Sequence, residues 1–469
     1  MLRLVARYVL DDRLGPHALK EADLKVLEGR VRTILAEIAA ERRAGQHRFR
    51  ELPHERPQLT EIKQVVRDYK DSTDNLVVLG IGGSALGNIA LQTALNPSTY
   101  NLLPAGERRG PRLFVLDNVD PVHCEAVFGF VGQDWPRTMV NVISKSGETA
   151  ETSAQFLIVR ERLIKALGEK AARQRIVVTT DAAGGTMRKI VDQEGYRSLI
   201  VPDGVGGRFS VLSAVGLLSA ALCGIDVDAL LAGAAQMDAV VSDPEPAMNW
   251  AAQIAMIHYL YDQRGKNIHV MMPYSQQLKD LTDWYRQLYA ESLGKVRPSD
   301  GVCVGPTPIK ALGATDQHSQ VQLYREGPND KVFTLLEVDA FDCDPKIPQA
   351  FEGVEAMQYL GRSPRGTLSG LLNAEKAATE LALLASQRPS ITVGFPRVDA
   401  RTVGQFIYLY ESMIPIMGKL YGINPYDQPA VERGKQWTFH LMGRKGYEQP
   451  PKDIKSASQN PCGTGVSPV

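Results

Sequence analysis

Apolar and polar positions follow two alternating patterns along this chain. Short apolar runs, typical of strands buried on both faces, occur at 76–80, 112–117, 138–144, 175–181, 267–275, 331–338 and 391–395. Longer stretches with apolar residues at helical spacing lie between and after them, at 85–95, 121–130, 149–167, 184–193, 211–223, 228–241, 247–264, 276–292, 366–387 and 402–421. Strands that alternate with helices in this way favour βαβ units and parallel sheets.

The order of these segments predicts an α/β protein. We expect two three-layer αβα sandwich domains with mainly parallel sheets, together with a helical segment at the N-terminus and a helical arm near the C-terminus. The last residues are rich in Pro, Ser and Gly and predict a disordered tail. The predicted boundaries are 1–60 for the N-terminal segment, 61–230 and 231–422 for the two domains, 423–447 for the arm and 448–469 for the tail.

The balance of charge narrows the class of partner. The 469 residues include 53 Lys+Arg and 53 Asp+Glu, so the formal net charge is +0. Broad binding to nucleic acid or to an anionic membrane needs a basic surplus, and no apolar run reaches the ~20 residues of a membrane span. The first residues also lack the apolar core of a signal peptide. We therefore expect a cytoplasmic protein that binds a small molecule, with no nucleic-acid or membrane partner.

The first candidate site is a glycine-rich turn between a predicted strand and a predicted helix. Glycines there let backbone N–H groups approach an anion at the start of the helix. The segment Gly80–Ala85 also fits the pattern G-x-G-x-x-[GA] of dinucleotide-binding folds, but an acid is expected ~20 residues later, and Asp117 lies farther along the chain. The turn alone is compatible with phosphate binding, with dinucleotide binding or with a simple tight turn. It contains Gly80, Gly82, Gly83 and Ser84.

A second turn with the same chemistry follows the predicted strand at 138–144. Its hydroxyls and the free N–H groups of the next helix favour a compact dianion, although Ser and Thr are also common helix N-caps. Both turns follow strands of one predicted parallel sheet, so we expect them at the same edge, where such sheets bind ligands. Together they predict recognition of a phosphate monoester. The second turn contains Ser144, Lys145, Ser146, Gly147 and Thr149.

Further segments contain groups suited to proton transfer and to the stabilisation of negative charge. Arg208 follows two glycines, from where a guanidinium can reach an oxyanion. Gln287 and Glu291 share one helix face, and Glu291 can act as a general base. The simpler interpretation of Glu291 is a surface ion pair with Lys295, four residues later.

Two more candidates lie in polar surroundings near predicted helix starts. His318 follows a Gly-led turn, and a neutral imidazole can move protons near neutral pH. Gln428 and Lys435 belong to the segment YDQPAVERGK. Each of these residues is also compatible with a solvated surface position. Neither H-x-x-x-H nor H-E-x-x-H occurs, so we expect no metal, and no cofactor is indicated.

Six of these segments, in order, resemble the glucose-6-phosphate isomerase (phosphoglucose isomerase) family, and its shorter bacterial branch in particular. They span about 80–435 and read GIGGSALG, SKSGETAET, GVGGRFSVLSAVGLL, ESLGK, DQHSQVQL and YDQPAVERGK. The resemblance implies a sugar isomerase-like (SIS) fold and a homodimer. It also implies reversible aldose–ketose isomerisation of glucose 6-phosphate and fructose 6-phosphate through ring opening and a cis-enediolate, in glycolysis and gluconeogenesis.

The resemblance also implies roles for individual residues. Glu291 matches the base that moves a proton between C1 and C2, and Arg208 matches the residue that faces the enediolate. His318 and Lys435 match the groups that open the sugar ring, and His318 is expected to reach the neighbouring subunit's site. Glu148 is a departure, since the family often has Thr there and an acid repels a dianion unless it points away. The residues expected to bind substrate are Gly83, Ser84, Ser144, Lys145, Ser146, Thr149, Gln287 and Gln428.

Three alternatives remain at this stage. A non-catalytic regulator that binds sugar phosphates would need the phosphate turns but not Glu291, His318 and Lys435. A dual isomerase would accept mannose 6-phosphate as well. An NAD-dependent dehydrogenase would use Gly80–Ala85, although the acid that holds the ribose is missing.

Overall fold

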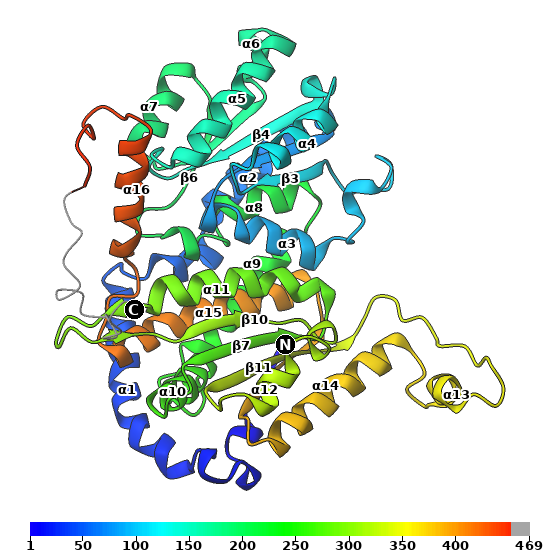
Figure 1. Cartoon of the computed structure of the whole chain (residues 1–469). Helices are drawn as coiled ribbons and strands as arrows, with labels where there is room; N and C mark the ends of the chain where they lie inside the picture. The colour runs from blue at the N-terminus through cyan, green and yellow to red at the C-terminus, as the bar shows by residue number, and fades with distance from the viewer. Residues whose placement is uncertain (452–469) are drawn as a thin grey trace, which may run out of the picture.

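Two sheets of mainly parallel strands organise the protein (Figure 1). The computed structural model describes residues 1–451. The first sheet has the order β3-β2-β4-β5-β6, and all its neighbouring strands are parallel. Its strands are β2 (Asn75–Leu79), β3 (Arg112–Leu116), β4 (Thr138–Ile143), β5 (Ile176–Thr180) and β6 (Arg197–Ile200).

Helices cover both faces of the first sheet, which explains why its central strands are buried throughout and mostly apolar. Val77 and Val140 pack on one face with side chains of α4, α5 and α7. Leu76 and Met139 point to the other face and pack with side chains of α2, α3 and α8. These helices are α2 (Arg56–Tyr69), α3 (Leu86–Leu95), α4 (Pro121–Val131), α5 (Ala150–Leu167), α7 (Gly185–Glu194) and α8 (Ala214–Leu222).

The second sheet has the order β1-β12-β11-β7-β10. Its strands are parallel except β1, which pairs with β12 in the antiparallel direction. One face packs against α10, α11 and α15, and the other against α12 and α14. The strands are β1 (Arg3–Val5), β7 (Ile268–Pro273), β10 (Thr307–Lys310), β11 (Lys331–Ala340) and β12 (Ser390–Arg397), and the helices are α10 (Trp250–Gln263), α11 (Lys279–Leu293), α12 (Val321–Glu326), α14 (Leu368–Ala385) and α15 (Ala400–Tyr421).

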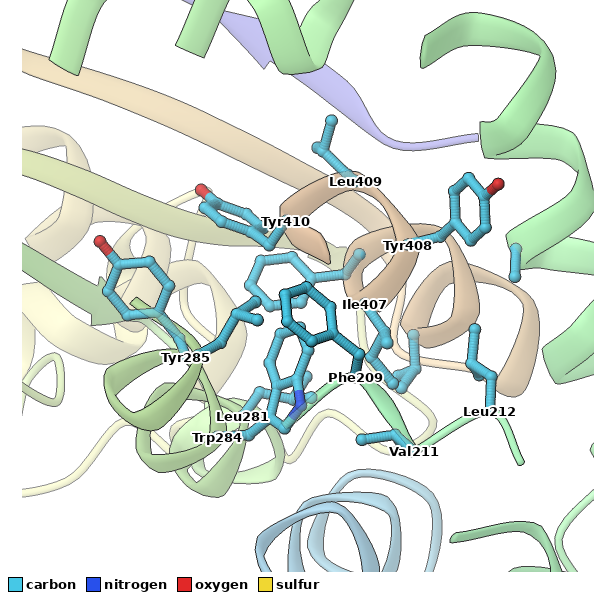
Figure 2. Close-up of a cluster of buried hydrophobic side chains, with 14 of the residues drawn as sticks. Phe209, Val211, Leu212, Leu281, Trp284, Tyr285, Ile407, Tyr408, Leu409 and Tyr410 are labelled. Carbon is cyan, nitrogen blue, oxygen red and sulfur yellow. The ribbon is translucent and has the colours of Figure 1, made fainter. Parts of the chain in front are cut away.

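One apolar core joins the inner helices of the two sheets. Figure 2 shows Phe209 among side chains of α11 and α15 that belong to this core, including Trp284 and Ile407. The shared core fixes the first sheet and its turns relative to α11. The α/β class with mainly parallel sheets, predicted from the strand–helix alternation, is confirmed.

Three further features concern the chain termini and the predicted boundary between the two domains. The N-terminal segment contains the helix α1 (Glu21–Arg43), but it begins with β1, which joins the second sheet. The helix α9 (Val227–Val241) spans the boundary predicted between 230 and 231. The C-terminal arm contains α16 (Pro429–Leu441), drawn in red-orange at the left of Figure 1. The predicted tail lies outside the described residues from 452 onward.

The sequence pattern did not predict several short strands. β6 and β10 lie at sheet edges, and β10 has exposed or half-buried residues throughout and includes Pro308. An edge strand with polar residues produces no continuous apolar run. The strands β8 (Lys295–Val296) and β9 (Cys303–Val304) form a hairpin, and each is only two residues long. Over residues 1–451, no helix is both long enough and apolar enough to cross a bilayer.

Candidate active site

Two hydroxyl-rich turns lie at the carboxyl ends of neighbouring strands. β2 and β4 pair in parallel with Leu79 opposite Val142, so the turns that follow them leave the same edge of the sheet. Ser84 lies in the short 3-10 turn Gly82–Ser84 after β2. Thr149 is the residue before α5, and its hydroxyl makes no capping hydrogen bond. The first N–H groups of α5 are therefore available to an anion at this edge.

The second turn is held in shape by its own hydroxyls. The Oγ of Ser144 accepts a hydrogen bond of 3.0 Å from the N–H of Gly147, and the Oγ of Ser146 accepts one of 3.2 Å from the N–H of Glu148. Lys145 donates to the carbonyl oxygen of Val205 at 3.3 Å. Gly147 has φ +72°, and a Cβ there would lie 2.3 Å from the backbone nitrogen of Met187. Glycine is thus required at this position.

A third turn, Gly207–Phe209, lies directly against the first one. A Cβ on Gly83 would lie 2.2 Å from the carbonyl carbon of Gly207 and 2.7 Å from the backbone nitrogen of Arg208. Gly83 therefore permits a backbone-to-backbone approach that brings Arg208 to the edge of the first sheet. The ring of Phe209 anchors the third turn by packing 4.9 Å, centroid to centroid, from Phe49.

Arg208 is the centre of the polar contacts at the site. Its side chain is only 2% exposed. Burial lowers the pKa of Arg208, and the nearby charges of Glu291 and Asp427 act in the opposite direction. Its partners come from α11 and from the segment before α16: Ser292 Oγ at 2.7 Å, Gln428 Oε1 at 3.0 Å, Glu291 Oε1 at 3.2 Å, and the carbonyl oxygens of Pro425 at 2.6 Å and Asp427 at 3.1 Å.

Glu291 is held between Arg208 and Gln287. Its Oε1 faces Arg208, and its Oε2 accepts a hydrogen bond of 3.0 Å from Gln287 Nε2. Gln287 in turn lies against the first hydroxyl-rich turn, because a Cβ on Gly82 would lie 2.9 Å from Gln287 Nε2. The surface pair with Lys295 is not present, since Lys295 pairs with Asp427 at 2.9 Å instead.

A cavity of about 850 Å³ opens in front of this group. Glu291 lines the cavity with about a quarter of its side chain exposed, alongside Gln287 and Gln428. The cavity is bounded by the last turns of α11, the β8–β9 hairpin and the start of α16. A carboxylate beside a buried guanidinium at the wall of a cavity can exchange protons with a bound molecule while the guanidinium offsets negative charge.

His318 lies at the other end of α11 from Glu291. It follows β10, whose last residue, Lys310, pairs with Asp283 in the second turn of α11 at 2.8 Å. Glu291 is two turns farther along the helix than Asp283, a rise of about 12 Å. His318 is exposed, and its ring makes no hydrogen bond to any residue within 1–451. One chain therefore does not bring His318 and Glu291 together.

Lys435 lies on α16, which begins at the cavity. Its side chain is half exposed and pairs with Glu432 at 2.6 Å. Lys435 does not line the cavity, whereas Pro429 and Val431 at the start of the same helix do. The structure thus places Arg208, Gln287, Glu291 and Gln428 in one group and holds Lys435 apart from it.

The sequence analysis missed two members of this group. Ser292 fixes the Nε of Arg208, and Asp427 fixes both Arg208 and Lys295. The one indication of their role in the sequence is their neighbours. Ser292 directly follows Glu291 in ESLGK, and Asp427 directly precedes Gln428 in YDQP. Within residues 1–451, no three His, Cys, Asp or Glu side chains gather in a way that could hold a metal ion.

Comparison with known proteins places the chain in a family. The family model for phosphoglucose isomerase matches residues 66–450. A glucose-6-phosphate isomerase of Carboxydothermus hydrogenoformans is 42% identical over 457 residues, covering 97% of this chain and 96% of the relative. One from Rubrobacter xylanophilus is 45% identical over 401 residues, covering 85% of this chain and 90% of the relative.

A solved structure agrees with these matches. A hypothetical protein from Thermus thermophilus superimposes with a TM-score of 0.82 at 36% identity, covering 94% of this chain and 100% of that one. The family match covers more than half of the chain, and the relatives align over nearly their whole length. The chain therefore belongs to the phosphoglucose isomerase family.

Proposed function

We propose that this protein is an enzyme that interconverts glucose 6-phosphate and fructose 6-phosphate, an aldose–ketose isomerisation of glycolysis and gluconeogenesis in the cytoplasm. The observation that carries the proposal is the contact between Arg208 and Glu291 at 3.2 Å, at a cavity whose wall also touches a phosphate turn through Gln287. The relatives over almost the full chain are glucose-6-phosphate isomerases, which supports the same reaction.

The two hydroxyl-rich turns hold the phosphate. Ser84, Ser144, Ser146 and Thr149 supply hydroxyls, Lys145 supplies a positive charge, and Gly83 lets the turn that carries Arg208 approach the first of these turns. The N–H groups at the start of α5 and the helix dipole favour the dianion. Gln287 and Gln428 contact the sugar, so the carbon chain extends from the phosphate turns towards Glu291.

Glu291 transfers the proton. In the forward direction its carboxylate removes the proton from C2 of the open-chain aldose, which leaves a cis-enediolate. It then returns a proton to C1 while the hydroxyl proton moves from O2 to O1, which gives the ketose. The negative charge on the oxygens of the enediolate develops next to Arg208. Because the guanidinium is fixed by five protein acceptors before substrate binds, it needs no reorganisation during the reaction.

Ring opening falls to Lys435 and His318. One of them protonates the ring oxygen as the other removes the proton from the hydroxyl on C1, and the bond between C1 and the ring oxygen breaks. We infer that His318 acts in the site of a second subunit, because within one chain it lies at the opposite end of α11 from Glu291.

A homodimer is the assembly that this inference requires. The segment around α13 (Glu355–Arg362) extends away from the body in Figure 1, and none of its helical residues is buried. Phe351, Val354, Met357 and Tyr359 on this extension are at least 47% exposed. Apolar side chains on an extension favour contact with a second chain.

The first test is an isomerase assay with a chelator present. The wild-type protein should interconvert the two hexose phosphates, and Glu291→Gln should reduce kcat by several orders of magnitude while binding of a substrate analogue is kept. Lys435→Ala should impair turnover of the cyclic sugar more than turnover of an analogue that cannot cyclise. Full activity of Glu291→Gln, or equal losses for both substrates in Lys435→Ala, would contradict the assigned roles.

Mixed dimers test the position of His318. Glu291→Gln and His318→Gln chains are each inactive as homodimers under the proposal. When the two are unfolded together and refolded, a shared site predicts that one of the two sites in each mixed dimer contains both native residues. About half of the chains should then enter mixed dimers, and activity should return to roughly a quarter of wild type. No recovery in dimers shown to be mixed would place His318 in its own chain's site.

The assay also separates the alternatives. A regulator that only binds sugar phosphates would bind the substrate analogue but show no turnover in the wild-type protein. A dual isomerase would convert mannose 6-phosphate in the same assay, and both hexose phosphates are therefore included. The Arg208–Glu291 contact at the cavity favours the enzyme over the regulator, because phosphate binding alone does not need a carboxylate there.

A further inference from the structure

The C-terminal arm contacts the body at both of its ends. At the start, Arg208 binds Gln428 and the carbonyl oxygen of Asp427. At the far end, Arg444 Nη2 lies 3.3 Å from Glu148 Oε1. Between these attachments α16 has no buried residue, and it carries Lys435 on its exposed surface. The two attachments thus flank the helix that carries Lys435.

Arg444 is held in place by the turn to which it belongs. Its guanidinium lies over the ring of Phe439 at 4.3 Å from the centroid and over the ring of Tyr447 at 5.5 Å. The two rings pack edge to face at 5.1 Å. His440 Nδ1 lies 2.8 Å from the carbonyl oxygen of Tyr447, which closes the turn. A guanidinium held between two rings presents its N–H groups in a fixed direction.

Glu148 is an unusual residue to find in a turn that binds a dianion. Its N–H is bonded to the Ser146 hydroxyl, and it directly precedes Thr149 at the start of α5. A free carboxylate at this place would repel a phosphate dianion. The pair with Arg444 supplies the compensating positive charge and turns the carboxylate towards the arm.

We propose that Glu148 is a positioning residue whose pair with Arg444 ties the arm to the phosphate turn, so that a phosphate bound at the turn and Lys435 at the sugar ring are placed together. The inference rests on the proposed function, because it takes the turn as the phosphate site and Lys435 as a ring-opening group. In the ligand-free chain Lys435 pairs with Glu432. When a bound phosphate orders the turn, the pair of Glu148 and Arg444 transmits this ordering to the arm.

The test is a double-mutant cycle with Glu148→Gln, Arg444→Gln and the double variant, assayed on glucose 6-phosphate and on an aldose phosphate analogue that cannot cyclise. Both side chains are nearly half exposed, at 49% and 40%, so the coupling is that of a surface pair, about twofold to fivefold. Arg444→Gln should raise KM for both substrates by that factor, because Glu148 is left uncompensated beside the phosphate. Glu148→Gln should leave KM unchanged or lower.

The double variant provides the decisive comparison. Adding Glu148→Gln to Arg444→Gln should bring KM back to that of Glu148→Gln alone. Each single variant should lose about twofold to fivefold in kcat on the cyclic sugar but not on the analogue, and the double variant should lose no more than either one. The change in KM thus measures the repulsion of phosphate by Glu148. The change in kcat on the cyclic sugar measures the loss of the attachment that positions the arm.

Arg162→Gln is the matched control. Arg162 pairs with Glu125 and lies 4.7 Å from the centroid of Phe128, so it has the same two kinds of partner in the same half of the molecule, away from the cavity. It should leave KM and kcat unchanged. The inference is overturned if the two single effects add in the double variant, or if cyclic and open-chain turnover fall together. An inactive wild-type protein would instead overturn the proposed function itself.

Discussion

Replacement of Arg208 by lysine is the most informative single change at the site. Arg208 donates from three nitrogens to five acceptors, and its side chain is only 2% exposed. A lysine side chain has three N–H donors on a single nitrogen, so it cannot reach the five acceptors that the planar guanidinium contacts. Two of the acceptors, Ser292 Oγ and the carbonyl oxygen of Pro425, lie in buried hydrogen bonds, and each costs about 1–3 kcal/mol when it loses its partner, so the free energy of unfolding should fall by about 1–6 kcal/mol. Loss of a preorganised donor at the enediolate should lower kcat by about 10²–10³-fold.

Two measurements separate these effects. Thermal or urea unfolding gives the loss of stability, and the chelated isomerase assay below the unfolding transition gives kcat. Arg50→Lys is the control, because Arg50 is also buried and binds Asp238 at 2.8 Å, but its partners are Asp238, Tyr408 and Ser242 rather than Glu291. It should be destabilised while kcat is kept. If Arg208→Lys retained kcat within about threefold of wild type while folded, the argument that Arg208 offsets the charge of the enediolate would be refuted.

Three further predictions concern packing, charge and pH. Gly83→Ala should lower kcat/KM by about 10²-fold, because its Cβ would meet the backbone of Gly207 at 2.2 Å, whereas Gly106→Ala, with no atom within 4 Å, should have no effect in the same assay. Asp238→Asn should lower the free energy of urea unfolding by about 3–5 kcal/mol, because Arg42 and Arg50 would lose their shared carboxylate; a loss below 1 kcal/mol would show that this cluster is not structural. Burial lowers the pKa of His258 to about 3 and that of His269 well below 6.5, so the unfolded chain binds protons that the folded chain does not, and each histidine should cost about 1.4 kcal/mol of stability per pH unit as the pH falls below about 6.5. His269→Gln should reduce that slope between pH 6.5 and 5.5, and an unchanged slope would rule out a proton-linked contribution from His269.

The fold was largely predictable because buried parallel strands leave a strong pattern. β2, β4 and β5 are buried along their whole length and mostly apolar, and their predicted ends lie within one residue of the observed ones. The edge strand β10 is half exposed and polar, so it leaves no such pattern. Strand β1 is three residues long and pairs with β12, which lies almost 400 residues later in the chain. No local sequence pattern indicates such a distant pairing.

Four members of the candidate site, Arg208, Gln287, Glu291 and Gln428, were predictable from the sequence, but their contacts were not. Arg208 and Ser292 are 84 residues apart in the chain, and Arg208 and Gln428 are 220 apart. These segments meet because Phe209 packs in the core that the two sheets share and because the backbone of Gly83 approaches that of Gly207. The interpretation of Glu291 as a surface partner of Lys295 was equally reasonable from spacing alone. It is wrong because Asp427, from a distant segment, takes Lys295.

The glycines of the first turn illustrate how one pattern can serve two kinds of chemistry. In a dinucleotide-binding fold, such glycines leave room for a pyrophosphate. Here the room is taken by protein. The space beside Gly82 holds the amide of Gln287, and that beside Gly83 holds the backbone of Gly207. The glycines of this pattern therefore allow α11 and the turn of Arg208 to approach the first hydroxyl-rich turn closely. The same close approach accompanies the contact between Arg208 and the carboxylate of Glu291.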